Sequence, residues 1–525
     1  MKLKKHSLFF LFMAISCNFF SQTDYVDTSN YADLRGRIKS QNFFIKMDPN
    51  NVDAYLRRGV YKLQLRDYTG AIEDNLEVIK IAGDKADAYN NIAMAQVGQR
   101  DSINALKNFE KAIELEPKAA MGYLNIAYGK ATFRDYKGAI KDLTKAIELK
   151  PDYAKAYHNR GFNKNLMGDT KGALEDYNKT LEVKPDYFEA YYNRANVLAK
   201  LGKFEDAVKD FNTAVVINPG FYPAIIDRAS VKAEMKDYDG AIKDLDAVSE
   251  MDPSNVTVFA GRGKIKIDTK DYAGALKDLD KAMELEPRYT SLRYYTGAIK
   301  NELKDFKGAI EDLDKYIIEN PNDTMAYLFR GVAKMGSFDN KGALKDFTKT
   351  IELDRKNAVA YNNRGVIRKR LNDIDGALSD LNKCIELKKD YAKAYANRAS
   401  IKNELKKYDD AMEDFNKSVA LDPKDVETLS NRGLCKYNKG ETKEAIKDYN
   451  KAIEIDPNVA VTYNNRALAK HELKDYAGAI EDYTKALALD PFLDKIYSYR
   501  ALSYEKIGDL KNAKLDNEKA ASMKK

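Results

Sequence analysis

Between residues 155 and 184, apolar and polar positions alternate with the period of two short helices separated by a turn. The pair Gly168-Asp169 interrupts the pattern, and Asp169 is placed to cap the N-terminus of the second helix. Pro185 prevents that helix from continuing. The apolar positions of the first helix are Ala156, Tyr157, Gly161 and Leu166, and those of the second are Ala173, Leu174, Tyr177 and Leu181.

The same pattern recurs every 34 residues along most of the chain. Alanine stands in one frame at 71, 105, 139, 173, 207, 241, 275, 309, 343, 377, 411, 445, 479 and 513, and Gly or Ala stands twelve residues earlier each time. Proline closes most units, and no insertion or deletion interrupts them. Each unit is therefore predicted to be a helical hairpin whose helices cross at a small residue.

A hairpin of this size cannot bury its apolar stripe alone, so neighbouring units must stack. Equal unit lengths make the stacking geometry repeat. The expected fold is all-α, a right-handed superhelical solenoid of antiparallel helix pairs in 34-residue repeats, with one concave wall.

The pattern resembles the tetratricopeptide repeat family, whose unit carries an aromatic residue, a Gly or Ala, a later Ala, an aromatic or Leu, and a terminal Pro. The resemblance covers residues 52–525, which would form fourteen tandem repeats. Tyr replaces the family's common Trp at the first aromatic position, as at Tyr157 and Tyr361. In the last unit Lys514 and Asn517 replace apolar residues, so that unit is expected to act as a C-terminal cap.

The N-terminus reads as an export signal over residues 1–21, with lysines followed by a short apolar run. Ala14-Ile15-Ser16-Cys17 resembles a bacterial lipoprotein processing site, which makes Cys17 a candidate for lipidation. Plain cleavage, after Ser16 or before Gln22, is the favoured alternative. Residues 22–51 form an N-terminal segment, in which residues 31–48 are expected to be a helix covering the first repeat.

Arginine precedes the small crossing residue in eleven units, and an Asp follows each Arg sixteen residues later. In the second unit both members change together, to Ile92 and Asn108. The pattern predicts an ion pair within each hairpin, with a structural role rather than an anion-binding one. The arginines are Arg58, Arg160, Arg194, Arg228, Arg262, Arg330, Arg364, Arg398, Arg432, Arg466 and Arg500.

Candidate partner-binding residues stand at the frame position before the arginine position, with Tyr294 alongside, and this position is expected to face the groove. Two blocks of amides can bond the backbone of an extended peptide, or can simply be solvated. Between the blocks aromatic residues replace the amides and offer an anchor for a partner's side chain. The candidates are Asn91, Asn125, Asn159, Asn193, Tyr294, Tyr295, Phe329, Asn363, Asn397, Asn431 and Asn465.

Composition excludes several other functions. The net charge of +7 falls to +4 without the leader lysines, and basic and acidic residues alternate along each helix, unlike a nucleic-acid-binding face. The remaining cysteines, Cys384 and Cys435, are expected to be buried fillers. The sequence has no catalytic or phosphate-binding motif, and His471 lacks the second histidine of a zinc helix.

We therefore expect a non-enzymatic protein with no cofactor and no metal. It would be an exported monomer in the periplasm, at the outer membrane or outside the cell. Its partner would be a protein or peptide held in the groove, with no nucleic acid and no membrane-spanning segment, since no apolar run is long enough. The alternative is a structural spacer or self-assembling solenoid of the envelope without a groove ligand.

Overall fold

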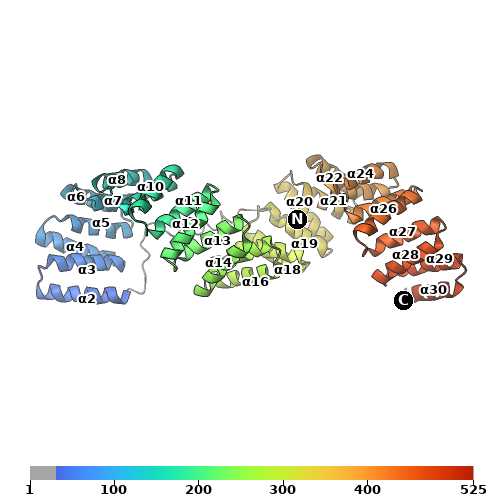
Figure 1. The fold of residues 1–525 in the computed structure, drawn as a ribbon, viewed down its shortest axis with the longest axis horizontal. Helices are drawn as coiled ribbons and strands as arrows, with labels where there is room; N and C mark the ends of the chain where they lie inside the picture. Colours follow the sequence, from blue (N-terminus) through green and yellow to red (C-terminus); the bar gives the residue numbers. More distant parts are fainter. Residues whose placement is uncertain (1–30, 524–525) are drawn as a thin grey trace. The chain divides into compact units, whose positions relative to one another are not determined.

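The structure is a computed structural model that describes residues 31–523, and every element in that range is a helix. The chain divides into unit 1, which ends at Arg288, and unit 2, which begins at Tyr289 (Figure 1). Each unit is described by itself. The predicted export signal and Cys17 lie outside the described residues.

Unit 1 contains helices of similar length that alternate in direction. Their bounds are α2 (Tyr31–Met47), α3 (Val52–Gln64), α4 (Tyr68–Ala82), α5 (Ala86–Gly98), α6 (Ser102–Leu115), α7 (Ala120–Thr132), α8 (Tyr136–Leu149), α9 (Ala154–Leu166), α10 (Thr170–Val183), α11 (Phe188–Lys200), α12 (Phe204–Ile217), α13 (Tyr222–Glu234), α14 (Tyr238–Met251), α15 (Val256–Asp268) and α16 (Tyr272–Leu285).

Unit 2 begins with a short 3₁₀ turn, η2 (Thr290–Leu292), and continues with further helix pairs. Their bounds are α17 (Arg293–Glu302), α18 (Phe306–Glu319), α19 (Thr324–Gly336), α20 (Asn340–Leu353), α21 (Ala358–Arg370), α22 (Ile374–Leu387), α23 (Ala392–Glu404), α24 (Tyr408–Leu421), α25 (Val426–Asn438), α26 (Thr442–Ile455), α27 (Ala460–Glu472), α28 (Tyr476–Leu489), α29 (Asp494–Lys506) and α30 (Leu510–Met523).

Within a pair, an odd-numbered helix packs against the even-numbered helix that follows it. The turn between them is local and is specified by the sequence. In α9–α10, Gly168 has a φ of 85°, which favours glycine, and the Asp169 carboxylate accepts a hydrogen bond from the Gly172 N–H at 2.9 Å. This confirms the predicted cap, and it explains where the second helix begins.

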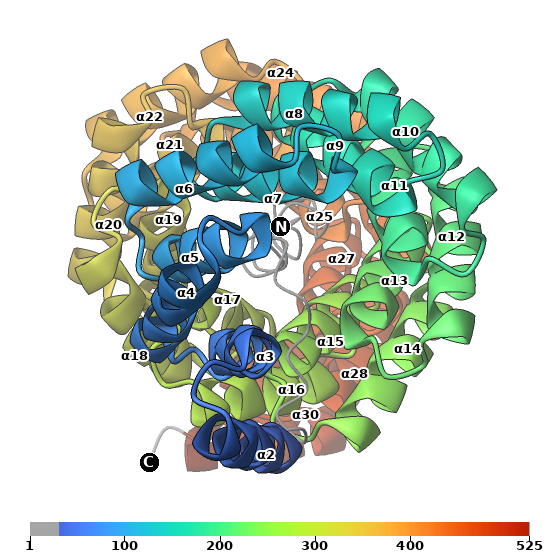
Figure 2. The same ribbon diagram turned by 90° about the vertical axis from the view of Figure 1, so that its left-hand side faces the viewer.

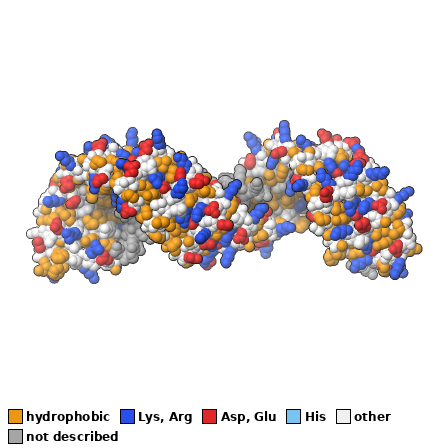
Figure 3. Space-filling model, in the orientation of Figure 1, with side chains coloured by type: hydrophobic (Ala, Val, Ile, Leu, Met, Phe, Trp, Pro, Cys, Tyr) orange, Lys and Arg blue, Asp and Glu red, His pale blue; other side chains and the backbone are white. Residues whose placement is uncertain are grey.

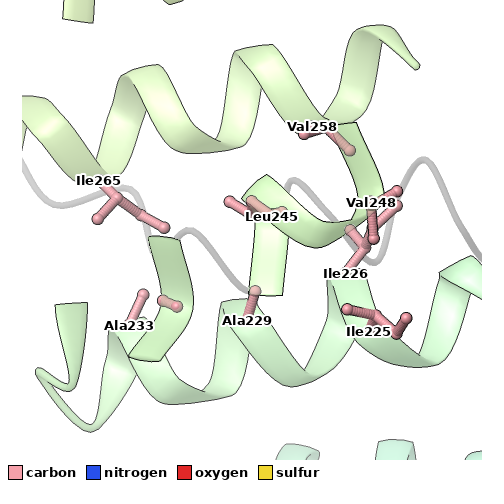
Figure 4. Packing of buried hydrophobic residues seen from close by; sticks show 9 residues of the cluster. Ile225, Ile226, Ala229, Ala233, Leu245, Val248, Val258 and Ile265 are labelled. Atoms are coloured by element: carbon pink, nitrogen blue, oxygen red, sulfur yellow. The ribbon is translucent and has the colours of Figure 1, made fainter. Parts of the chain in front are cut away.

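The core is a series of small clusters shared by consecutive pairs. Figure 4 shows one of them, in which Ile225 from α13, Leu245 and Val248 from α14, and Val258 and Ile265 from α15 pack together. Each of these side chains is buried, so each stabilises the stack by about 1.5–3 kcal/mol. The cluster joins one helix pair to the next.

Close approach of the two helices depends on the small residue at their crossing. A Cβ atom on Gly331 would lie 2.7 Å from the Phe347 ring, and one on Gly297 would lie 2.7 Å from Leu313. The recurring alanines of the even-numbered helices are buried, Ala173 and Ala343 among them. The predicted crossing is therefore confirmed as a steric requirement.

Each unit, taken by itself, is a solenoid of helix pairs. In Figure 2 the chain of unit 1 turns clockwise as it recedes from the viewer, which is a right-handed superhelix. The odd-numbered helices line the inner side of that turn and the even-numbered helices the outer side. We call the surface of the odd-numbered helices of each unit its inner face. The all-α solenoid predicted from the sequence is confirmed.

Candidate functional site

The predicted ion pairs are present in all eleven hairpins that carry the Arg and the Asp. In α23–α24, Arg398 Nε donates to Asp414 Oδ2 at 2.8 Å, and Arg398 Nη2 donates to Asp414 Oδ1 at 2.6 Å. This bidentate arrangement raises the pKa of Arg398, chiefly through the hydrogen bond to Asp414. The carboxylates are buried, so the pair joins the two helices of one hairpin.

Each arginine also makes contacts that the sequence analysis missed. Arg398 Nη1 donates to Asn382 of the preceding even-numbered helix at 2.7 Å, and its guanidinium lies 5.7 Å from the Tyr395 ring centre. Lys402, four residues on, reaches the same Asp414 at 2.7 Å. The guanidinium is thus fully engaged across three helices. This supports the structural role and leaves no arginine ladder for an anion.

The hairpins without the pair satisfy their polar groups differently. In α5–α6 the place of the Arg is taken by buried Ile92, and Asn108 donates to Gln96 Oε1 at 2.8 Å. In α17–α18, Thr296 stands where the arginine would be and donates to Asp312 at 2.8 Å. Lys300 reaches the same carboxylate at 2.6 Å. In α7–α8 buried Ile126 takes the place of the Arg, and Asp142 is retained as the partner of Lys130 at 2.6 Å.

In unit 2 the predicted amides lie on the inner-face helices α21, α23, α25 and α27 and are half-buried. Asn397 Nδ2 donates to Asn362 Oδ1 of the preceding inner helix at 2.9 Å, and Asn362 Nδ2 donates to Asn363 Oδ1 at 3.1 Å. Asn464 donates to Asn465 at 3.3 Å. The Asn431 side chain makes no hydrogen bond within the described chain. One bond, Asn397 to Asn362, therefore links two successive inner helices, and the others join neighbouring amides within one helix.

Asn362 and Asn464 were missed by the sequence analysis, which considered only the residue before each Arg. The signal was present as the doublets Asn362-Asn363 and Asn464-Asn465. The Asn464 Oδ1 atom is buried and has no hydrogen-bond partner among the described residues, and the same holds for Asn301 Oδ1 in α17. Unused acceptors of this kind reduce stability unless another group satisfies them.

In unit 1 the corresponding amides lie on α5, α7, α9 and α11. A histidine, His158, is hydrogen-bonded to two of them, Asn159 and Asn193. Asn193 Nδ2 lies 2.8 Å from His158 Nε2, and His158 Nδ1 lies 3.3 Å from Asn159 Oδ1. Burial lowers the pKa of His158 to about 4, so the ring is neutral near pH 7. Neutral imidazole fits this geometry, because Nε2 then accepts the amide N–H while Nδ1–H donates.

The other amides of unit 1 behave differently from one another. Asn91 Nδ2 donates to Asn75 Oδ1 of α4, the preceding even-numbered helix, at 3.0 Å. Asn125 is half-buried and makes no hydrogen bond within residues 31–523. Asn159 is buried, which corrects the expectation that it is open to a ligand. Its side chain orients His158 instead.

The aromatic candidates form one cluster near the start of unit 2. The Tyr294 ring lies 5.3 Å from Tyr295, 5.5 Å from Tyr316 and 5.6 Å from Phe329. Phe329 is only 4% exposed, so its ring is a core residue and not an anchor for a partner, which corrects that expectation. Tyr294 and Tyr295 are half-buried and remain on the inner-face helix α17.

Half-buried apolar residues accompany the amides on the inner face of unit 2. Val332, Val366, Leu434 and Leu468 stand three residues after the candidate position in their helices, close to one helical turn away. The inner-face helices of unit 2 thus combine amides that bond in two directions with adjacent apolar side chains. This combination suits the backbone and alternate side chains of an extended polypeptide.

Other chemistry is sparse in the described part of the chain. No group of three or more His, Cys, Asp or Glu residues there could hold a metal ion. Cys384 and Cys435 are free and buried, as predicted, and burial raises their pKa values to about 12 and about 11. On the face shown in Figure 3, basic and acidic side chains are interspersed. None of the helices in residues 31–523 combines the length and hydrophobicity needed to cross a bilayer.

Family models match this chain at several places. Models described as tetratricopeptide repeat match residues 188–221, 392–425, 426–459 and 460–493, and also residues 86–118 and 358–391. A model described as TPR repeat matches residues 135–163 and 166–202. No curated protein matches the chain.

Solved structures resemble it at low identity. The APC/C hetero-tetramer Cut9-Hcn1 is 18% identical with a TM-score of 0.41, over 93% of this chain and 95% of that one. Yeast Tom70 is 19% identical with a TM-score of 0.37, over 82% and 95%. YrrB, described as a TPR protein with an unusual peptide-binding site, is 27% identical with a TM-score of 0.31, over 34% and 92%.

The family follows from the repeat and from the model matches together. Hairpins of constant length cross at Gly or Ala, most of them begin their second helix at a capping Asp, and tetratricopeptide models match them in both units. The chain belongs to the tetratricopeptide repeat family.

Proposed function

We propose that this protein is a non-catalytic scaffold that holds an extended segment of another polypeptide along the inner face of unit 2. The observation that carries the proposal is the linked row of Asn362, Asn363 and Asn397, with Asn464 and Asn465 further along. Amides both donate and accept, so they can bond a peptide backbone of any sequence. A tetratricopeptide array is a scaffold of the kind that commonly binds proteins.

The neighbouring side chains would determine which segments bind. Val366 and Leu434 lie beside the amides and would contact apolar side chains of the ligand. Asn301 and Asn464 have acceptor oxygens without partners among the described residues, and a donor on the ligand would satisfy them after a small rotation of each amide. We therefore expect a ligand with uncharged, partly apolar residues and with exposed backbone.

The test is a pull-down with the full chain and with a variant in which Asn363, Asn397, Asn431 and Asn465 are all changed to Ala. A control variant carries Asn322→Ala and Asn458→Ala, two exposed amides outside the inner-face helices. A protein retained by the parent and the control but lost by a folded inner-face variant supports the proposal. Retention of the same proteins by all three chains would contradict it.

If none of the chains retains a partner, the alternative of a structural spacer or self-assembling solenoid is favoured. We propose a monomer whose last repeat, α29–α30, acts as the C-terminal cap, with Lys514 and Glu518 exposed on α30 beside the exposed apolar residues Leu510 and Leu515. Light scattering of the full chain distinguishes the two. Growth into large assemblies with rising concentration would favour the spacer.

We also propose that the protein is bacterial and exported, as the sequence of residues 1–21 indicates. Fractionation of a bacterial host that expresses the tagged full chain tests this directly. A shortened chain in the envelope or medium supports export, and an unprocessed cytoplasmic chain contradicts it. Metabolic labelling with a fatty acid, compared between the parent and Cys17→Ser, distinguishes lipidation from plain cleavage.

A further inference from the structure

The first helix of unit 1, α2, occupies the place of an even-numbered helix. Arg58 Nη1 donates to Asn42 of α2 at 2.7 Å, just as Arg194 Nη1 donates to Asn178 of α10 at 2.7 Å. The frame places Arg37 where every other even-numbered helix has its buried Ala. The Arg37 side chain bonds Asp33 at 2.8 Å and lies 5.9 Å from the Tyr61 ring centre.

Helix α2 has two apolar faces. Leu34 and Gln41 are buried and Ile38 and Ile45 are half-buried, and this face packs against α3. On the opposite side Phe43 is 60% exposed and Met47 is 71% exposed, one turn apart. Phe44, next to them, is 48% exposed and its ring lies 5.9 Å from that of Phe43.

An aromatic residue is unusual at the frame position of Phe43. In the 34-residue frame, its position is solvent-facing and holds a lysine in most of the repeats. These lysines are Lys111, Lys145, Lys179, Lys281, Lys315, Lys349, Lys383, Lys417, Lys451, Lys485 and Lys519. An apolar ring has replaced a charged side chain at a site where the fold does not bury it.

Basic side chains border this apolar strip. Arg35, Lys39 and Lys46 are exposed and follow one another along one side of α2 at helical spacing. The helix contains one acidic residue, Asp33, which is already paired with Arg37. Some helices of the chain balance such charges locally, as Lys179 does with Glu182 at 2.7 Å in α10. The net positive charge of α2 is therefore not neutralised within the helix.

We propose that this surface docks the protein on an anionic lipid bilayer. We call it the α2 outer face and define it by Phe43, Phe44 and Met47 together with Arg35, Lys39 and Lys46. The apolar side chains would enter the interface while the cations remain at the level of the lipid headgroups. Exposed aromatic rings on one helix, bordered by cations, suit the surface of an anionic bilayer.

The chain contains no tryptophan, so one introduced indole reports on this surface alone. The experiment adds vesicles of phosphatidylcholine with about one-third phosphatidylglycerol to the full chain carrying Phe43→Trp. We expect the emission of the introduced indole to shift to the blue and to saturate with lipid. The control is Phe492→Trp, since Phe492 is 85% exposed in unit 2, and its emission should not change.

Two further variants separate the apolar and the electrostatic contributions. In sedimentation with the same vesicles, Phe43→Ser with Phe44→Ser should lower the vesicle-bound fraction at least fivefold. Lys39→Glu with Lys46→Glu should do the same for anionic vesicles, and should make no difference with phosphatidylcholine alone. All variants carry the same residues 1–30, so any binding through those residues is common to them. Circular dichroism verifies that each variant is folded.

Two results would overturn the proposal. One is an indole emission in the Phe43→Trp variant that stays at the wavelength of exposed tryptophan while the chain sediments with vesicles. The other is a blue shift that appears without lipid as the protein concentration rises, because a second copy of the chain would then cover the α2 outer face. If α2 does not bind bilayers, the proposal that the inner face of unit 2 holds a polypeptide still stands, because the pull-down variants carry an intact α2.

Discussion

In unit 1 the inner-face helices α9 and α11, and in unit 2 the inner-face helices α21 and α23, are joined by a side-chain hydrogen bond at the same frame positions. The residues that form this link differ between the two units. His158 and Asn193 meet at 2.8 Å in one region, and Asn362 and Asn397 meet at 2.9 Å in the other. The two pairs occupy identical positions in the 34-residue frame. The frame therefore decides which positions meet between neighbouring repeats, and the residue type decides whether the link responds to pH.

The two regions share the ion pair between the Arg and the Asp of one hairpin, which we call the arginine staple. Arg194 is bonded to Asp210, and Arg398 is bonded to Asp414. They differ in the residue that stands beside it, His158 in unit 1 and Asn362 in unit 2. Both continue to the next residue along the helix, His158 to Asn159 at 3.3 Å and Asn362 to Asn363 at 3.1 Å, and the Tyr187 ring packs against His158 at 5.0 Å. We infer that the staple maintains the hairpin, while the neighbouring position is free to vary and can serve a ligand.

Breaking the shared staple should have the largest effect. Arg398→Met leaves the buried carboxylate of Asp414 with Lys402 as its remaining charged partner, and should lower the free energy of unfolding by about 2–3 kcal/mol. The double variant Arg398→Met with Asp414→Leu should lose less. Urea unfolding followed by circular dichroism measures both. Equal losses in the single and double variants would show that the pairing contributes nothing.

The histidine link should make unit 1 sensitive to acid. Burial depresses the pKa of His158 to about 4, below its usual value of 6.5, so the unfolded chain binds the proton more readily. Stability from this group is therefore full above pH 6.5 and is lost as the pH falls towards 4. The loss should reach about 3 kcal/mol.

His158→Asn replaces the histidine with the residue that stands at the same frame position in α21, Asn362. The variant should lose the part of the pH dependence of stability that comes from His158. Thermal midpoints of the parent and the variant, compared at pH 7.5 and pH 4.5, provide the measurement. His471→Asn serves as a control, because His471 is engaged with Ser503 at 2.8 Å rather than with an amide of the row. A parent and a variant with parallel pH profiles would rule out His158 as the source.

Removing a single amide from unit 2 should have the smallest effect. Asn397→Ala deletes one hydrogen bond to buried Asn362 without introducing a charge, so we expect a loss of about 1 kcal/mol in stability. Ligand retention should fall more clearly than stability does. A variant that unfolds at the parent's urea midpoint but no longer retains the partner would show that Asn397 serves the ligand site and contributes little to stability, unlike the arginine staple.

Much of this fold could be predicted from the sequence, because the information is local and repeated. A capping Asp169, a turn at Gly168 and a crossing at Gly161 each act within one hairpin. The Arg–Asp pairs were also predictable, since a separation of sixteen residues within a hairpin is fixed by the two helix lengths. The change of both partners to Ile92 and Asn108 in one unit indicated the contact.

The sequence did not indicate how far each candidate side chain is buried, nor which neighbours it bonds. Phe329 and Asn159 stand in the same frame position as half-buried Asn397, yet both are buried, because the size and packing of neighbouring side chains differ from repeat to repeat. Asn362 and Lys402 became visible as partners only when separate helices were brought together. The repeat alone determined the all-α solenoid, whereas tertiary packing decided which residues of its inner face remain available to a partner.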